Sequence, residues 1–374
     1  MIRKELVIGI SLLFLGAFVI PSGASVQTSD KTIITVDDEP GDADFTSIKE
    51  AVNSSSPGDT IEVYSGIYRE DGIRITKENI SLLGISQELG AGNDSEKPFI
   101  KPDGTATVIR VEASHVIVSN FRIEKISSST CITLGAEEPN RYQNNNTISD
   151  CFMINPYGSG ILFNGIGRDI SIMNNTIYGC SLYGISADSL DFRIQGNEII
   201  DIDHNGIAIR YCRGKNISYN KIESCKTGIY IYQGNENSIY GNDIRSCHTG
   251  IVNAYGTDNM ITGNNIELCP IGFFEEFGRG NHITKNNFQE CWYILPWFKV
   301  RFLDFLLNKD TWKGNYWEIW RSIAPKPVPS PKIIPGILCM GFSIAGEIPI
   351  ALLFPWIALD RQTALEPYDI LGWS

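Results

Sequence analysis

A single short stretch holds side chains of the kinds that perform acid–base chemistry. Residues 201–215 read DIDHNGIAIRYCRGK and contain Asp201, Asp203, His204 and Arg210. Two carboxylates can act as acid and base in hydrolysis of a glycosidic bond, or they can hold Ca²⁺ against a uronate. A histidine can abstract a proton, and an arginine can bind a substrate carboxylate. These four residues are the candidate catalytic group, and a polar turn that faces solvent is the alternative interpretation.

A repeat of about 22 residues determines where this stretch lies. The first column of the repeat consists of asparagines: Asn175, Asn197, Asn220, Asn242, Asn264 and Asn286. The second column consists of glycines, each followed by an apolar residue: Gly160, Gly184, Gly206, Gly228, Gly250 and Gly272. Within each unit apolar residues alternate with polar ones, which is the periodicity of short strands. A short strand cannot bury its face alone, but stacked copies can, so each unit predicts one turn of a parallel β-helix.

The residue types of the two columns suggest how each turn is closed. Asparagine tolerates left-handed backbone geometry and its side chain bonds to nearby backbone, so the Asn column is typical of turn positions. Stacked asparagines can also bond to one another along the stack. The Gly column is interpreted as a bend that other residues would make only with strain.

Five of the nine cysteines share one position of the repeat. They are Cys180, Cys225, Cys247, Cys269 and Cys291. Ile202 takes this position in the intervening unit, so we expect it to point inward and the thiols to serve as small apolar groups. A disulfide ladder and a soft-metal site are the alternatives. Parallel Cβ vectors match disulfide geometry poorly, and a column spreads its thiols along the stack.

Strand alternation after the Gly column points two files of residues outward. The first file contains Ser186, Ala208, Tyr230, Val252 and Phe274, and the second contains Asp188, Arg210, Tyr232, Ala254 and Glu276. Aromatic rings stack on sugars, and charged groups bond to sugar hydroxyls or carboxylates. The predicted substrate-binding residues are therefore Asp188, Arg210, Tyr230, Tyr232, Phe274 and Glu276. Ordinary strand-surface composition, which is rich in Tyr and Phe, is the alternative.

The ends of the chain differ from the repeat. Residues 1–24 read as a signal peptide, with a basic start, an apolar run and small residues before the cleavage site, so we expect a secreted or cell-surface protein. An uncleaved helix is the alternative and would be the one contact with a membrane. Residues 25–300 are assigned to the β-helix with an N-terminal cap. Residues 301–374 are assigned to an irregular, Trp-rich wrapping or capping segment, with a transmembrane helix as the alternative.

The N-terminal cap is predicted from residues 44–54, DFTSIKEAVNS. Ser47 and Glu50 are spaced as a capping box at the start of a short amphipathic helix. Such a helix would cover the open first turn of the β-helix. A run of acidic residues precedes it: Asp37, Asp38, Glu39, Asp42 and Asp44. These carboxylates are candidate Ca²⁺ ligands without a recognised loop spacing, and Asp44 is interpreted as a helix cap.

At this point the chain resembles a known family. Residues 34–84, from ITVDDEPGDADFTSIKEAV to ISLLG, are similar to the N-terminal cap and first coils of pectin-lyase-like right-handed β-helix proteins. The Asn and Gly-Ile units resemble the NosD-like, carbohydrate-binding and sugar-hydrolase group. GNYW at 314–317 and EPYDI at 366–370 resemble closing segments of secreted archaeal members. The resemblance implies a single-stranded right-handed parallel β-helix that binds a polysaccharide or cell-surface glycan.

The resemblance leaves the chemistry open. The signatures of pectin methylesterases, polygalacturonases and the main pectate lyases are missing from this sequence. If the protein is an enzyme, we expect a polysaccharide lyase or a glycoside hydrolase. A non-catalytic structural or adhesive rod is the first alternative, and a NosD-type copper accessory protein is the second. The four histidines do not cluster in the sequence, so no metal ligands are assigned, and Ca²⁺ is the candidate cofactor.

The composition limits the partners. The chain has 374 residues, 43% of them hydrophobic, and a net charge of −12. This hydrophobic content suits a folded domain with a large core. The negative charge and the lack of a basic stripe argue against a nucleic-acid partner. The partner that the resemblance implies is a glycan, and we expect the protein to be a monomer.

Overall fold

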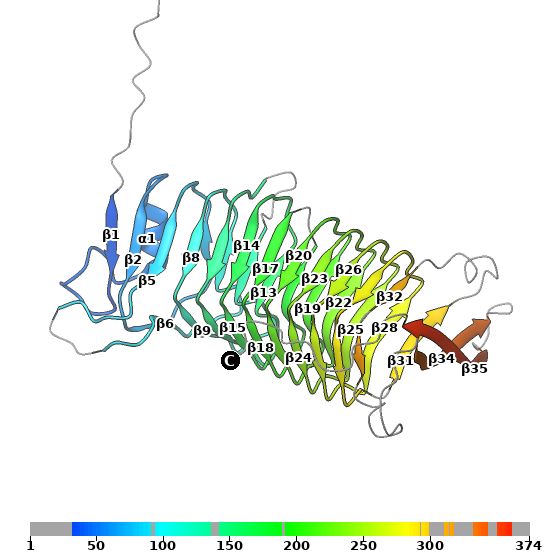
Figure 1. The fold of residues 1–374 in the computed structure, drawn as a ribbon. Coiled ribbons are helices and arrows are strands. Elements are labelled where there is room, and N and C mark those ends of the chain that lie inside the picture. The colour runs from blue at the N-terminus through cyan, green and yellow to red at the C-terminus, as the bar shows by residue number, and fades with distance from the viewer. Residues whose placement is uncertain are drawn as a thin grey trace, which may run out of the picture. The chain divides into compact units, whose positions relative to one another are not determined.

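The computed structural model describes residues 32–90, 94–135, 142–188, 191–291, 293–298, 310–313, 315–317, 332–342 and 350–360. These described residues belong to one compact unit. This unit is an all-β, right-handed parallel solenoid built from three sheets (Figure 1), which confirms the predicted fold class. The predicted signal peptide, residues 1–24, lies outside the described residues. Within the described part, no helix has the length and apolar character needed to cross a membrane.

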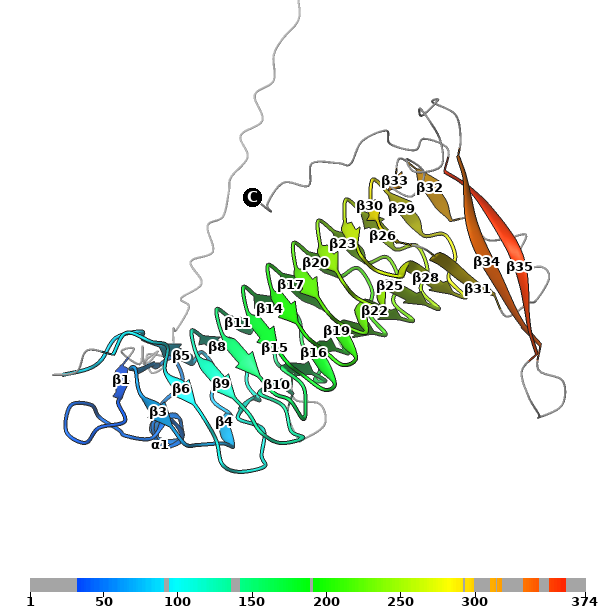
Figure 2. The same cartoon turned by 90° about the horizontal axis from the view of Figure 1, so that it is seen from below.

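Three sheets, named A, B and C in the order in which each turn visits them, run along the stack of turns (Figure 2). Sheet A contains β1 (Ile33–Val36), β2 (Thr60–Val63), β5 (Ser81–Gly84), β8 (Ile117–Ser119), β11 (Thr147–Ser149), β14 (Ile170–Met173), β17 (Phe192–Gln195), β20 (Asn216–Ser218), β23 (Ser238–Tyr240), β26 (Met260–Thr262), β29 (His282–Thr284) and β32 (Thr311–Lys313). Sheet B contains β3 (Ile67–Tyr68), β6 (Phe99–Ile100), β9 (Arg122–Glu124), β12 (Phe152–Ile154), β15 (Thr176–Tyr178), β18 (Glu198–Ile200), β21 (Lys221–Glu223), β24 (Asp243–Arg245), β27 (Asn265–Glu267), β30 (Asn287–Gln289) and β33 (Tyr316–Trp317).

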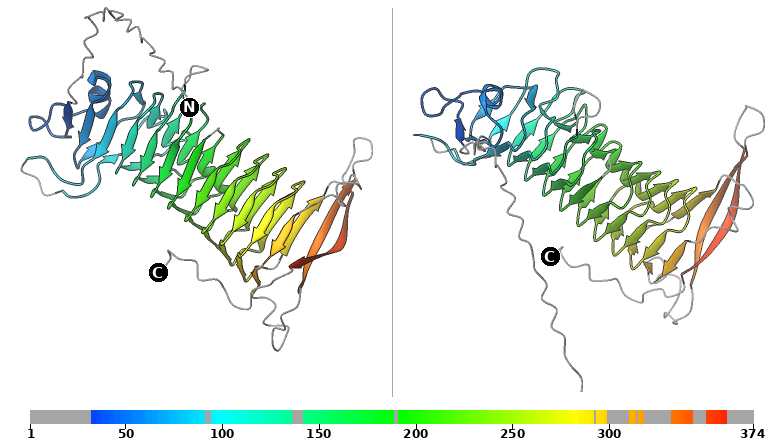
Figure 3. Two further views of the ribbon diagram at one scale, coloured as in Figure 1. Left: turned by 45° about the horizontal axis from the view of Figure 1, so that its top comes forward. Right: turned by 90° about the horizontal axis from the view of Figure 1, so that it is seen from above.

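Sheet C carries the longer strands of each turn. It contains β4 (Ile73–Ile75), β7 (Ile109–Val111), β10 (Ile132–Leu134), β13 (Ile161–Phe163), β16 (Tyr183–Ala187), β19 (Asn205–Arg210), β22 (Thr227–Tyr232), β25 (Thr249–Ala254), β28 (Ile271–Glu276), β31 (Tyr293–Phe298), β34 (Lys332–Phe342) and β35 (Ile350–Asp360). All pairings in the three sheets are parallel except that of β34 with β35. Figure 3 shows the regular stacking of these turns from two further sides.

The register of the sheets places equivalent residues of successive turns side by side. In sheet A, Ile172, Ile194 and Ile217 are aligned partners, and the alignment continues through the later turns. These side chains are fully buried. Burying each isoleucine contributes about 1.5–3 kcal/mol, and a slip of one residue would turn the whole row to solvent. The alternating apolar pattern therefore determines the register.

An asparagine ladder connects the turns at the corner between sheets A and B. In each step the Nδ2 group of one Asn donates to the Oδ1 atom of the next, as between Asn197 and Asn220 at 3.0 Å. The same Oδ1 atom accepts the backbone N–H of Asn197, also at 3.0 Å. The ladder runs through Asn175, Asn197, Asn220, Asn242, Asn264, Asn286 and Asn315. The predicted bonding along the stack is thus confirmed.

The predicted left-handed geometry of the Asn column is wrong. The left-handed residue is the one that precedes each ladder asparagine, such as Asn174 with φ 55° or Tyr219 with φ 54°. The ladder position is fully buried because its side chain must reach two neighbouring turns. The turn strain is therefore carried by the adjacent exposed position.

The interpretation of the Gly column as a bend that only glycine makes without strain is also wrong. These glycines are not in the left-handed region. They are needed because the backbone of the next turn passes too close for a side chain. A Cβ atom on Gly228 would lie 2.6 Å from the carbonyl oxygen of Gly250 and 2.6 Å from Cγ2 of Ile244.

The cysteine column points inward, as predicted. All five of its members are buried and free, and so are Cys131, Cys151 and Cys212. Burial raises the pKa of Cys151 to about 11 and the pKa of Cys180 to about 12. The column thiols are free, buried packing groups, which excludes a disulfide ladder in this column.

The predicted N-terminal helix is present as α1 (Ile48–Ser54), which lies against β4 at the end of sheet C. Ser47 Oγ accepts the N–H of Glu50, while the N–H groups of Ile48 and Lys49 donate to the carboxylate of Glu70. Asp44 is not the cap, because it accepts bonds from Thr35 instead. That α1 covers the first turn against solvent stays a prediction.

The repeat continues beyond residue 300, where the sequence pattern had been lost. β32 and β33 extend sheets A and B, and Asn315 lies 29 residues after Asn286 in the ladder. The apolar segment after the prolines forms an antiparallel hairpin of β34 and β35, and β34 pairs with β31. This confirms the interpretation of that segment as strands. The segment 366–370 lies outside the described residues.

Candidate functional site

The structure does not bring the four candidate catalytic residues together. Asp201, Asp203 and His204 are exposed in the connection that precedes β19. Arg210 is the last residue of β19, a six-residue strand. At about 3.3 Å per residue, the end of this strand that carries Arg210 lies about 20 Å from His204. One substrate bond cannot be in contact with both ends, so these residues do not form a single catalytic group.

Arg210 instead belongs to the outer face of sheet C, where it contacts three side chains of the preceding turn. Its Nε atom donates to Asp188 Oδ1 at 2.7 Å, and its Nη2 atom donates to Ser186 Oγ at 3.1 Å. Its guanidinium also lies 5.6 Å from the ring centroid of Tyr183. Burial lowers the pKa of Arg210, but the hydrogen bond and charge of Asp188 outweigh it, so the net pKa is raised. This cationic group is fixed in place and only partly exposed.

Beside Arg210, aromatic rings form a continuous row across four turns. We call this row the aromatic strip, and it consists of Tyr211, Tyr230, Tyr232, Tyr255 and Phe277. Tyr232 is its centre: its ring lies 5.6 Å from Tyr211, 6.4 Å from Tyr230 and 5.7 Å from Tyr255, centroid to centroid. Tyr255 then stacks on Phe277 at 4.8 Å. Three steps of about 4.8 Å give the strip a length of about 14 Å.

The local backbone explains why the rings project. Tyr211, Tyr255 and Phe277 occupy the same left-handed position just after a sheet C strand, with φ of 56°, 58° and 54°. Tyr230 and Tyr232 are outward residues of β22, with one inward residue between them. The rings at the corner and those on the sheet thus meet edge to face or stacked, which are favourable geometries for aromatic pairs. Tyr211 and Tyr255 remain 64% and 41% exposed.

The two predicted outward files have the predicted register. Tyr230 pairs with Ala208 and Val252, and Tyr232 pairs with Arg210 and Ala254. Phe274 and Glu276 follow at the far end of the same files. Five of the six predicted binding residues thus have aligned places on one face, and the sixth, Asp188, is bonded to Arg210.

The electrostatics of this face vary along its length. Arg210 and Asp188 form an ion pair at one end, and Glu276 lies at the other. Burial, and then the charge of Glu276, raise the pKa of Tyr230 and of Tyr255. Both hydroxyls are therefore protonated at neutral pH and can donate hydrogen bonds. The face offers stacked rings, hydroxyl donors, one cation and separate carboxylates.

Soft-metal donors are spread out in the described part of the chain. The one group of three His, Cys, Asp or Glu side chains found there with ligand atoms within 4.8 Å of one another is Asp37, Asp38 and Glu39. This group offers only oxygen atoms as metal ligands. The histidines are exposed at separate places, and the described thiols are buried, five of them along the column. These donors do not suit copper, which prefers converging sulfur or imidazole ligands.

Sequence reasoning missed three residues of the aromatic strip. Tyr211, Tyr255 and Phe277 do not belong to the alternating pattern of a strand, so alternation gave them no direction. A usable signal was present, since they are spaced by 44 and 22 residues, multiples of the repeat. Gln233 interrupts this spacing, because it occupies the equivalent position between Tyr211 and Tyr255.

Comparison with solved structures shows the same fold in other proteins. The lacto-N-biosidase of Eubacterium ramulus is 13% identical, with a TM-score of 0.51 over 76% of this chain and 64% of that one. The enzymatically active domain of tailspike protein 2 of bacteriophage CBA120 is 12% identical, with a TM-score of 0.50 over 64% of this chain and 39% of that one. This chain spans less than two thirds of either protein. At such identities the likeness concerns the fold alone.

Comparison with sequence families is more specific. A search of curated proteins finds no match. The model of the right-handed β-helix region matches residues 211–295. A second model, described as periplasmic copper-binding protein (NosD), matches residues 52–247. Because this match covers more than half of the chain, the protein belongs to the NosD family of right-handed β-helix proteins.

Proposed function

We propose that this protein is exported and binds an extended polysaccharide or cell-surface glycan along the outer face of sheet C. The observation that carries the proposal is the aromatic strip, a row of touching rings that remains partly open to solvent. The C–H face of a sugar is apolar with a slight positive charge, and the face of an aromatic ring is negative. Successive sugars can therefore stack on successive rings.

The polar groups beside the strip suit the same ligand. Arg210 is held in place by Asp188 and can donate to a sugar hydroxyl or carboxylate. Tyr230 and Tyr255 provide hydroxyl donors. The partial burial of these groups means that little side-chain freedom is lost on binding, which favours affinity. We propose a linear glycan, because the strip is long and narrow.

The same geometry argues for binding without cleavage at this face. Asp188 and Glu276 flank the strip and belong to turns that are four steps apart, or about 19 Å. The two carboxyl groups of glycoside hydrolases are separated by roughly 5–9.5 Å. Asp188 and Glu276 are therefore too far apart to act on one bond. Asp201, Asp203 and His204 are the remaining candidates for catalysis and lie about 20 Å from Arg210.

Copper handling, which the family description names, is not supported by the described residues. Their sulfur and imidazole groups do not converge, and the group that does converge is made of carboxylates. We therefore derive no copper-dependent step. The export that we propose rests on the signal-like residues 1–24 and agrees with the periplasmic location in the family description.

The test is retention of the protein, expressed as residues 25–374, on a panel of immobilised acidic and neutral polysaccharides. We expect retention by at least one polymer. Tyr232→Ala and Tyr255→Ala should each weaken it about tenfold, which corresponds to about 1.4 kcal/mol. Reducing and unsaturated sugar ends are measured in the same samples, and we expect none to be released.

A second pair of tyrosines provides the matched control. Tyr219 and Tyr240 make a similar edge-to-face contact at 5.3 Å, but Tyr240 lies in β23 of sheet A and Tyr219 directly follows β20 of the same sheet. Tyr240→Ala should leave retention unchanged. Retention that is equally sensitive to Tyr240→Ala and Tyr232→Ala would overturn the assignment of the face. No retention on any polymer would favour a purely structural rod.

A further inference from the structure

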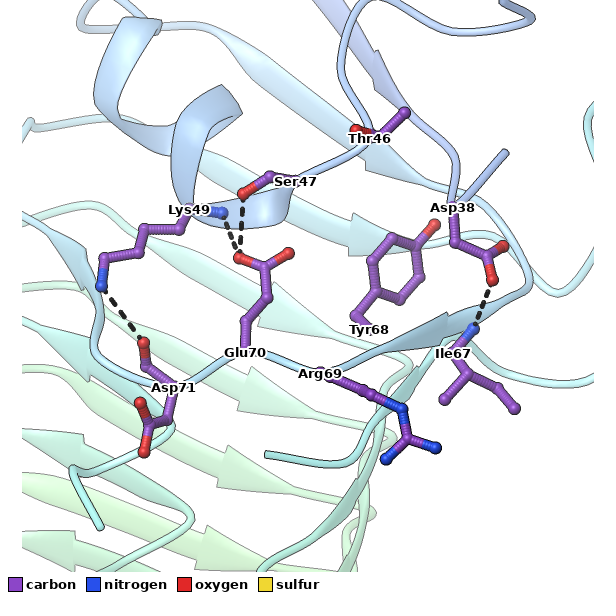
Figure 4. A pocket seen from close by; sticks show the side chains of 9 residues that line it. All are labelled: Asp38, Thr46, Ser47, Lys49, Ile67, Tyr68, Arg69, Glu70 and Asp71. Carbon is purple, nitrogen blue, oxygen red and sulfur yellow. Dashed lines mark hydrogen bonds between the residues drawn. The ribbon is translucent and has the colours of Figure 1, made fainter. Parts of the chain in front are cut away.

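A second site lies at the N-terminal end of the solenoid, where the chain leaves β1. Asp37, Asp38 and Glu39 follow the strand directly, and one carboxylate oxygen from each lies within 4.8 Å of the other two. The cluster borders an open hollow of about 560 Å³ that Asp38, Tyr68 and Arg69 help to line (Figure 4). It is separate from the aromatic strip.

The position of Asp37 distinguishes this cluster from an ordinary acidic surface. The residue is fully buried, and neither of its carboxylate oxygens has a hydrogen-bond partner among the described residues. Its carboxylate points toward those of Asp38 and Glu39. An ionised carboxylate buried without a partner costs several kcal/mol, unless a cation or donor compensates it. The fold therefore places a costly group where it can contribute to a shared ligand.

The groups around Asp37 do not provide that compensation. The charged groups that act on Asp37 are Glu88, Asp38 and Asp42, and all three are acidic. The Tyr68 hydroxyl donates to the backbone oxygens of Tyr64 and Val36, so it is directed elsewhere.

The basic side chains of the neighbouring hollow are also directed elsewhere. Arg69 pairs with Asp103 at 3.6 Å, and the Nζ atom of Lys49 donates to the backbone oxygen of Asp71. Figure 4 shows Lys49 on the far side of the hollow from Asp38. Asp38 itself is oriented by the backbone N–H of Ile67, which donates to its Oδ2 atom at 3.0 Å. This bond fixes one oxygen of Asp38, and a side-chain hydrogen bond also connects Asp38 with Glu39, so the two carboxyl groups lie side by side.

From this geometry we propose that Asp37, Asp38 and Glu39 form a Ca²⁺ site. Oxygen ligands alone favour a hard cation over copper or zinc. Calcium accepts several carboxylates in irregular geometry at 2.3–2.6 Å, whereas magnesium requires near-octahedral geometry and keeps most of its waters. Glu88 and Asp42 lie close enough to affect the charge of the site and can join through water.

A bound cation would tie together segments that are distant in the sequence. Asp38 bonds to Ile67 in β3, and Asp42 lies against Gly90, where a Cβ atom would be 2.3 Å from Asp42 Oδ2. The site thus connects the loop after β1 to the second turn and to the loop after β5. We expect Ca²⁺ to stabilise this end of the solenoid without changing glycan binding at sheet C.

The experiment uses the chain from residue 25, freed of metal by a chelator. Calorimetric titration with CaCl₂ should give one site with a Kd on the order of 10⁻⁴–10⁻³ M, as for extracellular calcium modules. Millimolar CaCl₂ should raise the Tm, and MgCl₂ should do so much less. Terbium(III), a luminescent substitute for Ca²⁺, should be sensitised by Tyr64 and Tyr68 and displaced by Ca²⁺.

Asp37→Asn is the decisive variant, because it keeps the shape of the side chain and removes the buried charge. It should fold, with a higher Tm than the wild type in chelator, and it should lose the response to Ca²⁺. Asp169→Asn, which alters an exposed acidic residue in a left-handed turn, should respond as the wild type does. Wild-type protein without a calcium response, a response kept in Asp37→Asn, or an equal response to Mg²⁺ would each overturn the proposal.

Discussion

The asparagine ladder gives the sharpest stability prediction. Changing Asn220 to Ala removes four hydrogen bonds at once. Two are accepted by its Oδ1 atom from Asn197, both at 3.0 Å, and two are donated by its Nδ2 atom, to Ile194 O at 3.1 Å and to Asn242 Oδ1 at 2.9 Å. All the groups left behind are buried. We expect the free energy of unfolding to fall by about 3–5 kcal/mol, since each bond contributes about 1 kcal/mol and orphaned groups cost more.

The measurement is urea unfolding followed by far-ultraviolet circular dichroism. Asn216→Ala is the matched control, because Asn216 is an exposed asparagine on the outer face of β20 and should change stability by less than about 0.5 kcal/mol. Asn220→Asp should be at least as harmful as Asn220→Ala at neutral pH, because a carboxylate cannot donate to Asn242 and would be buried. An Asn220→Ala protein as stable as the Asn216→Ala protein would refute the claim that the ladder holds the turns together.

Three further predictions follow from the core. Gly228→Ala should destabilise the fold by about 1–3 kcal/mol or more in the same urea assay, because its Cβ atom meets rigid backbone at 2.6 Å; a cost as small as for an exposed residue would contradict the close approach. A Cys339→Ser protein should react with a thiol reagent only as fast as it unfolds, since the other eight thiols are buried. Burial, and then the hydrogen bond and charge of Asp310, raise the pKa of Glu275 well above its ordinary 4.5, while Asn253 and Asn281 donate to it. A carboxyl group with a raised pKa in the folded protein stabilises the fold at low pH, and this contribution is lost as the pH rises. The Tm of Glu275→Gln minus the Tm of the wild type should therefore increase from about pH 5 to about pH 8. A constant difference would show that Glu275 ionises normally.

Sequence periodicity was sufficient to predict the fold because each turn repeats one simple pattern. Ile172 and its equivalents had to face inward, and the column at Cys180 had to be small and apolar, as the structure confirms. The turn geometry was harder to predict. Left-handed positions are occupied by Asn174, Gly196, Tyr219 and others, so they have no common residue type. The pattern therefore located the corners but not the residue that bends at each.

A second ladder escaped the sequence analysis for a different reason. At the corner between sheets C and A, the backbone N–H groups of Asn237 and Asn259 donate to the Oδ1 atoms of Asn259 and Asn281, and the Nδ2 group of Asn237 also donates to Asn259. Their 22-residue spacing was visible, but only three members exist, and Lys215 takes the preceding place. The extra turn beyond residue 300 was missed because its spacing rises to 29 residues.

The candidate site shows the limit of arguing from nearness in the chain. Asp201, Asp203 and His204 adjoin Arg210 in the sequence, yet an extended strand separates them by about 20 Å. Tyr211 and Tyr255 are 44 residues apart and both contact the ring of Tyr232. In a solenoid, proximity follows the repeat length, so residues one period apart are better partners than residues a few positions apart.

The ladder also makes the turns interchangeable. Asn220, Asn242 and Asn264 present the same donor and acceptor to the turns before and after them. Deleting residues 221–242, one whole period, would join Asn220 to the partner of Asn242 without altering any register. Such a change would shorten the aromatic strip by one position, and a duplication would lengthen it. If the strip binds a glycan as proposed, the length of glycan that it accommodates is adjustable in single-period increments, by gene rearrangement alone and without redesign of the core.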